Sequence, residues 1–507
     1  MAFADLVLRS TEKHRVLAEV DIAVPNTQWQ NSGAGIWYVN ALGLYPEWDD
    51  SLLNAFTAQG FGAIGSVRVD GAPLTRVSSR LLVTSTATSF YYDTAARELF
   101  VRLENYDEPS LHVVNIGVIY GYCAQGFSPT GGPGLYEGRL TRNPTVSKTR
   151  DPLFYGRLVF RSGSINLINS DGEFDAFGRD KDIYGNEARV KIGFDSIDYS
   201  DYKTVFTGYV DNFSVSEVDA TFTISDKRRQ LTKPVTRTDT NANALDTIAD
   251  ILNDAYGYSY DARFFDLTSW AAARSALPSA RANITLNMQE PEPVIDVIED
   301  IATSVFGLFF VTPDGKFSFK IVDTEPAPVA IIQAHDILNA HSLTYNPSEV
   351  VSSVRVGYNR NWTTSGTQYT YVGATSSTVF AQYKTYNERK IDTLLPTLTA
   401  ASAYATVVLN YTDTVRSVET ITVPLEHYAR ALGDMVGVVI QRGDQSMLGD
   451  RKAEVIGVEI AMDSPVVNLT IRDIGALEAF RQTEAGAIRQ TEAGEIRMVC
   501  YWQHTRR

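Results

Sequence analysis

Apolar and polar residues alternate in short runs along the first 130 residues, with Gly and Asp turns between the runs. This period of two is typical of half-buried strands, as in the strand–turn–strand phrase at 90–103. Apolar residues also recur at helical spacing over 48–59, where Gly60 would end the helix. We expect an N-terminal β-rich docking domain over residues 1–130. Its other predicted strands are 15–24, 66–69, 98–103 and 112–119.

A Gly- and Pro-rich stretch at 128–134 predicts a linker, because Gly permits positive φ and Pro removes a backbone donor. Short apolar runs then follow at regular intervals, and the sequence predicts a first all-β domain over 131–238. Such spacing is typical of a sandwich or barrel. The predicted strands of this module are 156–160, 164–168, 188–194, 204–212 and 220–225.

Helical periodicity replaces the strand pattern at about residue 240 and predicts an α+β middle domain over 239–345. Two helices are predicted, at 244–255 and 292–306, and either Asn241 or Asn243 could cap the first of them. A hairpin around Pro313-Asp-Gly315 should follow the second helix.

The strand pattern returns over 346–476 and predicts a second β domain, interrupted by one helix at 400–410. Residues 477–507 contain a tandem octapeptide and are expected to form a flexible or docking tail. The predicted strands are 350–358, 369–372, 415–424, 435–441, 453–460 and 466–472.

Two of the predicted hairpins resemble each other across about 250 residues. The phrases at 208–226 and 454–473 each contain a strand, a polar turn and a second strand ending in Thr-Ile-x-Asp. The predicted fold is therefore mainly β with an α+β insert, in which two related barrels or sandwiches join the N-terminal domain. A duplicated β-module favours a self-assembling scaffold over a catalyst.

Charge and composition exclude several classes of protein. The formal net charge of −15 argues against a nucleic-acid-binding protein, which needs a basic face, and against docking on anionic lipid. Cys123 and Cys500 are too few for a disulfide framework and are expected to be free thiols. The sequence shows neither a secretory signal nor an apolar run long enough to span a membrane, so we expect synthesis in the cytoplasm.

Several motifs could carry chemistry, and each also has an ordinary structural interpretation. The glycines of 60–65 match G-x-G-x-x-G, but they follow a predicted helix instead of opening one, which favours a turn. Neither His335 nor His341 belongs to a zinc motif, and both are expected to be solvated. We therefore expect neither catalytic, nor cofactor-binding, nor metal-binding residues.

Two acidic groups and one aromatic group leave alternatives open. The acidic run could bind calcium or form a structured turn, while the second acidic group could supply a glycosidase pair or be a chance grouping. The aromatic group could stack on a sugar or form a core or interface. The acidic run is Asn169, Asp171, Glu173, Asp175, Asp180 and Asp182; the second acidic group is Asp195, Asp198 and Asp201; the aromatic group is Trp29, Trp37, Tyr38, Tyr45 and Trp48.

Residues 135–496 resemble the hub proteins of bacteriophage tail tips and baseplates. The Gly-Ser-x-x-Leu-x-Asn-x-Asp-Gly-x-Phe-Asp phrase of that family is similar to 163–175, and its Leu-Gly-Asp-x-Val strand is similar to 432–436. Further similar phrases are 135–147, 205–211, the hairpin 307–319 and the C-terminal repeats at 481–496.

The resemblance implies a structural virion protein without catalytic activity and without a cofactor. Hubs of this family are homotrimers in which six tube-like domains form a ring that closes the distal end of the tail tube. The resemblance thus implies that the β domains at 131–238 and 346–476 are the two tube-like domains of this chain. The implied partners are a distal tail or tail tube protein, the tape-measure protein, and tip or fibre proteins. Two alternatives remain: a receptor- or carbohydrate-binding tail fibre protein, and a tail-associated cell-wall or capsule hydrolase.

Overall fold

The computed structural model describes most of the chain, in ranges separated by gaps. The described residues are 14–25, 30–33, 36–40, 64–69, 72–93, 98–103, 114–130, 136–150, 162–175, 177–180, 183–322, 328–339, 342–345, 349–363, 368–384, 386–439, 451–462, 466–476, 480–482 and 488–490. No helix within these ranges is long and apolar enough to cross a membrane.

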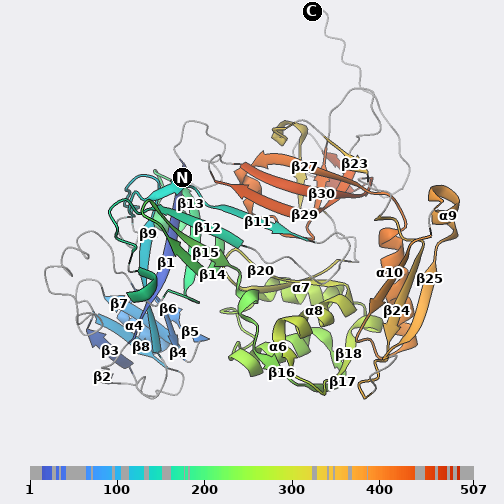
Figure 1. Cartoon of the computed structure of the whole chain (residues 1–507), viewed down its shortest axis with the longest axis horizontal. Coiled ribbons are helices and arrows are strands. Elements are labelled where there is room, and N and C mark those ends of the chain that lie inside the picture. The colour runs from blue at the N-terminus through green and yellow to red at the C-terminus, as the bar shows by residue number, and fades with distance from the viewer. Residues whose placement is uncertain are drawn as a thin grey trace, which may run out of the picture.

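One large sheet of 16 strands runs through the molecule (Figure 1). Its strands are β1 (His14–Pro25), β4 (Ile64–Val69), β5 (Ala72–Pro73), β9 (Val114–Tyr122), β10 (Leu140–Arg142), β11 (Thr145–Thr149), β12 (Ser162–Ile168), β13 (Glu187–Phe194), β14 (Lys203–Val215), β15 (Asp219–Ser225), β22 (Ala330–Ile332), β23 (Thr344–Tyr345), β27 (Ser417–Pro424), β28 (Met435–Val438), β29 (Arg451–Ala461) and β30 (Val466–Ala476). The main path is β23-β27-β30-β29-β11-β12-β15-β14-β13-β1-β9-β4-β5, while β10 pairs β12, and β28 pairs β22 and β29.

The N-terminal region extends this large sheet and adds a small one. Strand β1 pairs antiparallel with β13, from His14 opposite Phe194 to Val20 opposite Ala188, so the region continues the sheet of the first β-module. The small sheet has the order β2-β3-β8-β7-β6. Its elements are β2 (Gln30–Gly33), β3 (Ile36–Asn40), β6 (Thr75–Arg76), β7 (Ser89–Asp93) and β8 (Glu98–Arg102), with helix α4 (Arg80–Ser85) beside them.

The middle of the chain folds around helices with their own apolar core. Asn243 caps α6 by accepting hydrogen bonds from the backbone amides of Leu245 and Asp246, which decides between the two predicted caps. Gly315 has φ +79° in the turn of the predicted β20–β21 hairpin. The elements are β16 (Pro234–Val235), β17 (Thr238–Asn243), α6 (Ala244–Tyr256), α7 (Leu267–Ala276), β18 (Asn283–Asn287), β19 (Glu292–Pro293), α8 (Val294–Val305), β20 (Gly307–Val311) and β21 (Phe317–Ile321).

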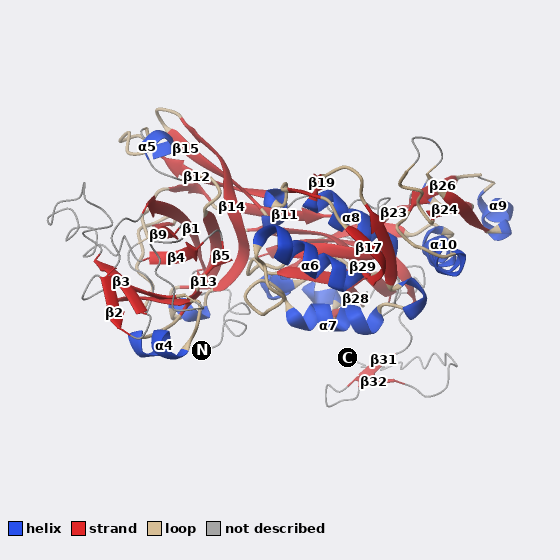
Figure 2. Cartoon of the chain, turned by 90° about the horizontal axis from the view of Figure 1, so that it is seen from below, coloured by secondary structure: helices blue, strands red, loops and turns tan. Residues whose placement is uncertain are grey.

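A second α+β unit interrupts the C-terminal β-module and packs on the middle domain through Phe306 and Leu308. Its sheet has the order β25-β24-β26 and is packed by α10, as Figure 2 shows from below. The elements are β24 (Ser353–Tyr358), β25 (Thr370–Thr375), α9 (Ser377–Tyr383), β26 (Glu388–Asp392) and α10 (Leu398–Thr412). Short turns of helix complete the chain: α5 (Phe177–Asp180), η2 (Tyr199–Asp201), η3 (Lys227–Gln230), η4 (Ser279–Arg281), η5 (Ala334–Asp336) and η7 (Leu425–Ala429), with a final pair β31 (Phe480–Gln482) and β32 (Ile488–Gln490).

The mainly β class with an α+β insert is confirmed, and the predicted helices at 244–255, 292–306 and 400–410 are α6, α8 and α10. Closed barrels are not found among the described strands, which form an open path. The outer edge of β13 pairs with β1 instead of closing on β12. The predicted helix at 48–59 and strand at 156–160 lie outside the described residues.

Candidate functional site: the junction between two β-modules

Two groups of four strands have the same topology. The first module is β12 to β15, and the second module is β27 to β30; in space they run β12-β15-β14-β13 and β27-β30-β29-β28. A short helical turn, α5 or η7, lies between the first two strands of each module. The duplicated phrase is therefore the second half of a larger duplicated unit, in which β14–β15 corresponds to β29–β30.

The two hairpins also have the same register and the same irregularity. Thr223 and Ile224 lie opposite Asn212 and Val210, so one residue of β14 is left over at this step. Thr470 and Ile471 lie opposite Gly457 and Val455, so one residue of β29 is left over at the same step. A β-bulge adds one unpaired residue and increases the local twist, so the modules bend at equivalent places.

A glycine turn before the second strand is repeated atom by atom. Gly185 has φ +73° and donates to Val210 O at 2.8 Å, whereas Gly433 has φ +75° and donates to Val455 O at 2.8 Å. The next residues accept hydrogen bonds from the amides of the same valines, at 2.9 and 2.8 Å. The left-handed backbone explains why each turn uses Gly.

Strand β11 joins the two modules into one sheet (Figure 1). Ser147 pairs with Ser162 of β12 on one side and with Glu459 of β29 on the other. All of β11, from Thr145 to Thr149, pairs antiparallel with residues 457–461. The modules of one chain therefore lie side by side, and β11 is the strand that connects them.

A buried ion pair fixes the end of this junction. Arg150 follows β11 and donates to the carboxylate of Glu454 in β29, and both side chains are fully buried. Tyr411 of α10 donates to the same carboxylate and accepts from Arg150 Nη2 at 3.1 Å. The junction is thus tied to the second module and to the α+β unit together.

The equivalent edge of the first module has no strand partner among the described residues. Residues 457–460 of β29 correspond to 212–215 of β14, which pair with β15 on one side and, on the other side, lie beyond the end of the pairing with β13. Val458 and Ile460, which lie beside β11, are 2% and 1% exposed, whereas Val215, the counterpart of Ile460, is 41% exposed. We call residues 212–215 the open edge.

Strand β23 lies beside β27 of the second module as β11 lies beside β12 of the first module. Thr344 pairs with Val418 of β27, which corresponds to Ser162 of β12, so Thr344 corresponds to Ser147. β23 is the last strand of the sheet path, and Thr344 and Tyr345 are exposed.

A second buried network ties β1 to the first module. Glu19 is fully buried and accepts hydrogen bonds from Tyr136 at 2.6 Å and Tyr199 at 2.5 Å. Burial alone would raise the pKa of Glu19, but the charges of Lys191 and Arg189 and the two phenols outweigh it and hold the pKa at about 2.

The acidic run at 169–175 is a structured turn. Asn169 is fully buried; it accepts from the amide of Phe174 at 2.9 Å and donates to Asp175 at 2.7 Å. The carboxylates of Asp171 and Glu173 form ion pairs with the guanidinium of Arg139, whose hydrogen bonds lower the pKa of Asp171 to about 2. The side chains of the two later acids of the run, at 180 and 182, lie outside the described part of the chain.

The structure does not gather the other candidate residues into one site. Asp195 pairs with Arg15, while Asp198 precedes the η2 turn that contains Asp201. The side chain of His335 is 81% exposed.

Two further motifs lie partly outside the described residues. Of the 60–65 motif, the described residues are 64 and 65, which begin strand β4, so they do not open a helix. Of the aromatic group, Trp37 and Tyr38 lie on β3, and the other members, Trp29, Tyr45 and Trp48, lie outside the described residues. The candidate His341 also lies outside the described residues.

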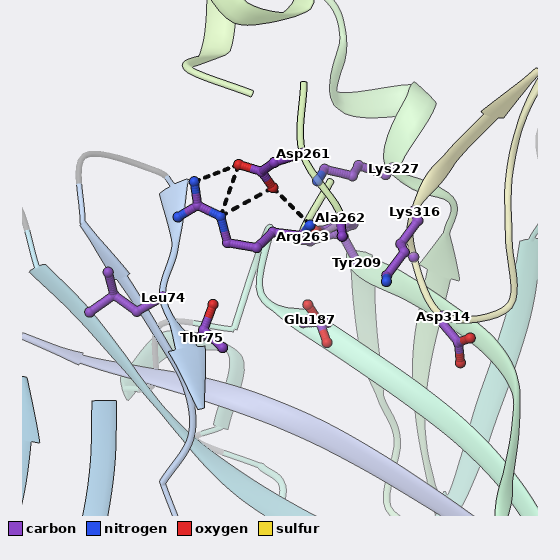
Figure 3. A pocket seen from close by; sticks show the side chains of 11 residues that line it. Leu74, Thr75, Glu187, Tyr209, Lys227, Asp261, Ala262, Arg263, Asp314 and Lys316 are labelled. Atoms are coloured by element: carbon purple, nitrogen blue, oxygen red, sulfur yellow. Dashed lines mark hydrogen bonds and ion pairs between the residues drawn. The ribbon is translucent and has the colours of Figure 1, made fainter. Parts of the chain in front are cut away.

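A pocket of about 690 Å³ lies where the N-terminal region, the first module and the middle domain meet (Figure 3). Arg263 reaches back to Asp261 with several hydrogen bonds, the shortest at 2.6 Å. The charged lining residues are balanced in sign; they are Glu187, Asp261, Asp314, Lys227, Arg263 and Lys316. This balance favours a seam between units over a site for a charged ligand.

The sequence contains a further signal of the duplication, beyond the Thr-Ile-x-Asp phrases from which the duplication was predicted. The Leu432-Gly-Asp434 segment of the second module has a counterpart in the first, Tyr184-Gly-Asn186. Both segments place Gly before Asn or Asp and about 20 residues before the phrase that ends in Thr-Ile-x-Asp.

The structure is similar to those of bacteriophage tail proteins, whereas no protein family and no curated protein matches the chain in sequence. The tail protein from Neisseria meningitidis MC58 is 12% identical, with 65% of this chain and 91% of that chain covered and a TM-score of 0.43. The 43 kDa tail protein of prophage MuSo2 from Shewanella oneidensis is 14% identical, with 68% and 96% covered and a TM-score of 0.42.

A third solved structure is a component of the type VI secretion system of E. coli, described as similar to the T4 bacteriophage tail proteins gp27 and gp5. It is 11% identical, with 66% of this chain and 73% of that chain covered and a TM-score of 0.37. At such values the likeness carries no functional argument, so the function has to be argued from the duplicated modules of this chain.

Proposed function

We propose that the chain is a structural hub of a phage tail tip or baseplate, in which three copies form a ring around the distal end of the tail tube. The observation that carries the proposal is the pairing of β11 with β29, which places two modules of equal topology side by side in one sheet. A repeated lateral contact of this kind generates a closed ring when each copy repeats it with the next.

The two open strands supply that next contact. If β23 of one copy meets the open edge of another copy as β11 meets β29, Thr344 lies opposite Ser214. Within the described ranges, β23 and residues 212–215 each pair with a strand on one side only, and an exposed edge is a risk for uncontrolled association. Closure of the ring would cover each edge with a defined partner.

The exposed side chains suit this contact. Val215 is 41% exposed on the open edge, and Tyr345 is 57% exposed on β23. In the junction within the chain, Val458 and Ile460, which correspond to Phe213 and Val215 of the open edge, are buried beside β11, whereas Glu459 is exposed. Pairing between copies would bury the open edge in the same way, through backbone hydrogen bonds and apolar contact.

In this proposal the chain has no catalytic role. It contacts a distal tail or tail tube protein and the tape-measure protein, and it carries tip or fibre proteins. It is synthesised in the cytoplasm of the bacterial host and acts in the virion. The N-terminal region, which continues the sheet of the first module through β1, would form an outer docking surface.

The test is the native mass of the full-length protein, alone and with its tail tube protein, followed by two-dimensional class averages. We expect a mass three times 56.0 kDa and a ring with six similar modules. A monomer under both conditions would refute the ring, and an elongated particle would favour the receptor-binding fibre alternative. A wall or capsule hydrolase would instead show activity that carboxylate variants abolish.

A further inference from the structure

Two carboxylates and one imidazole lie close together at one end of the second module. Asp336 ends η5, which follows β22, whereas Glu426 and His427 lie in η7, which follows β27. β22 pairs in parallel with β28 of the second module. One potential ligand atom from each of the three side chains lies within 4.8 Å of the other two.

His427 is the unusual member of this cluster. The residue is 6% exposed, and neither ring nitrogen has a hydrogen-bond partner within the described part of the chain. Its Nε2 lies 3.5 Å from Glu426 Oε1, which is too far for a good hydrogen bond. A buried polar group without a partner destabilises a fold, so this imidazole requires an explanation.

The charges around the imidazole suit a cation better than a second proton. Burial lowers the pKa of His427, which keeps the ring neutral, and neutral imidazole is the form that binds metal. The carboxylates of Glu426 and Asp336 face it and favour a positive charge, whereas Arg430 opposes one. Two carboxylates against one guanidinium leave a net negative site.

We propose that Asp336, Glu426 and His427 form a binding site for a divalent transition-metal ion of the zinc class. One imidazole nitrogen and two carboxylate oxygens are ligands that zinc accepts, and water can complete the coordination. Asp336 is held by the amide of Gln333, which donates to its Oδ2 at 3.0 Å. That hydrogen bond presents the carboxylate from η5 to a ligand pair carried by η7.

The ion would fasten two segments that are about 90 residues apart. η5 leads along the chain toward β23, and η7 connects β27 with β28. Bound metal would therefore stabilise the end of the second module independently of ring formation. This site goes beyond the proposed hub function and does not depend on it.

The test uses the full-length chain, without an affinity tag, and Zn²⁺ as the probe in isothermal titration calorimetry. Co²⁺ provides a second readout, because its visible absorption reports nitrogen and oxygen ligation directly. We expect one ion per chain, with affinity weakened at least about tenfold in His427→Asn and in Glu426→Gln. The matched control is His335→Asn, since His335 lies 3.3 Å from the same Asp336 but is 81% exposed.

Retained binding in His335→Asn together with its loss in both cluster variants supports the site. The proposal is overturned if the natural chain binds less than one Zn²⁺, or if Glu426→Gln binds as tightly as the natural chain. It is also overturned if His335→Asn abolishes binding while the cluster variants retain it. Glu426 is partly exposed, so Glu426→Gln decides the outcome even if His427→Asn fails to fold.

Discussion

Replacing Arg150 by Met tests the junction between the two modules. The Arg150–Glu454 pair is fully buried, and the amide of Arg150 also donates to Ile456 O at 2.9 Å. The substitution keeps most of the side-chain volume and the backbone hydrogen bond, but it leaves the carboxylate of Glu454 buried without its cation. The phenol of Tyr411 still donates to that carboxylate, and Arg472 of β30 lies opposite Glu454 in the sheet.

The expected loss follows from the burial of both groups. Removing one partner of a buried ion pair typically destabilises a protein by about 3–5 kcal/mol, because the remaining charge stays out of water. Because the hydrogen bond from the phenol survives, we expect Arg150→Met to lower the free energy of unfolding by about 3 kcal/mol, the lower end of this range. Removing the charge as well, in the double variant with Glu454→Gln, should recover at least about half of this loss.

Urea unfolding followed by far-UV circular dichroism measures these differences across the natural chain, both single variants and the double variant. The matched control is Arg142→Met, at an exposed position of β10, which should change the free energy of unfolding by less than about 0.5 kcal/mol. A loss below about 1 kcal/mol for Arg150→Met, or additive effects in the double variant, would refute the assignment of this pair to the junction.

Acid should weaken the attachment of β1 to the first module, because the pKa of Glu19 is about 2 in the fold and near 4.5 otherwise. The stabilisation by ionised Glu19 is complete above pH 4.5 and is lost as the pH falls toward 2, and Tyr136→Phe should make this loss smaller. Unfolding titrations at successive pH values measure the loss, and the same pH dependence in Tyr136→Phe as in the natural chain would contradict this role of Glu19. Gly433→Ala should destabilise the protein more than Gly185→Ala: both residues have positive φ, but a Cβ at 433 would lie 3.1 Å from the side chains of Leu308 and Lys320. Thermal melts compare the two variants, and equal losses in melting temperature would contradict the steric reason. Asn243→Ala should cost about 1 kcal/mol by removing the cap of α6, and a melting temperature equal to that of the natural chain would count against the cap.

Local patterns in the sequence predict the elements that bury a clear face. α8 buries residues along its whole length at helical spacing, so its periodicity is visible in the sequence. α7 is not predicted by such patterns, because it buries Trp270 and Ala273 alone and its Ala-rich sequence gives little contrast between faces.

Long-range pairings are beyond the reach of sequence patterns. The contact of β1 with β13 joins segments about 170 residues apart, and no local feature sets its register. The open edge is equally invisible, because nothing in the local sequence of β14 or β29 indicates that a strand covers residues 457–460 and that none among the described strands covers 212–215. The duplication itself is detectable, since the Thr-Ile-x-Asp ends fall at equivalent positions of the two hairpins.

The most direct test of the ring is a disulfide between copies, formed from Thr344→Cys and Ser214→Cys in one chain. The account predicts covalent dimers and trimers on non-reducing gels, because these residues would face each other across neighbouring copies. Each single variant serves as a control, and Ser147→Cys with Glu459→Cys should cross-link within one chain without changing its mass. Monomers alone from the Thr344/Ser214 pair, in a sample whose Ser147/Glu459 pair does cross-link, would contradict the account.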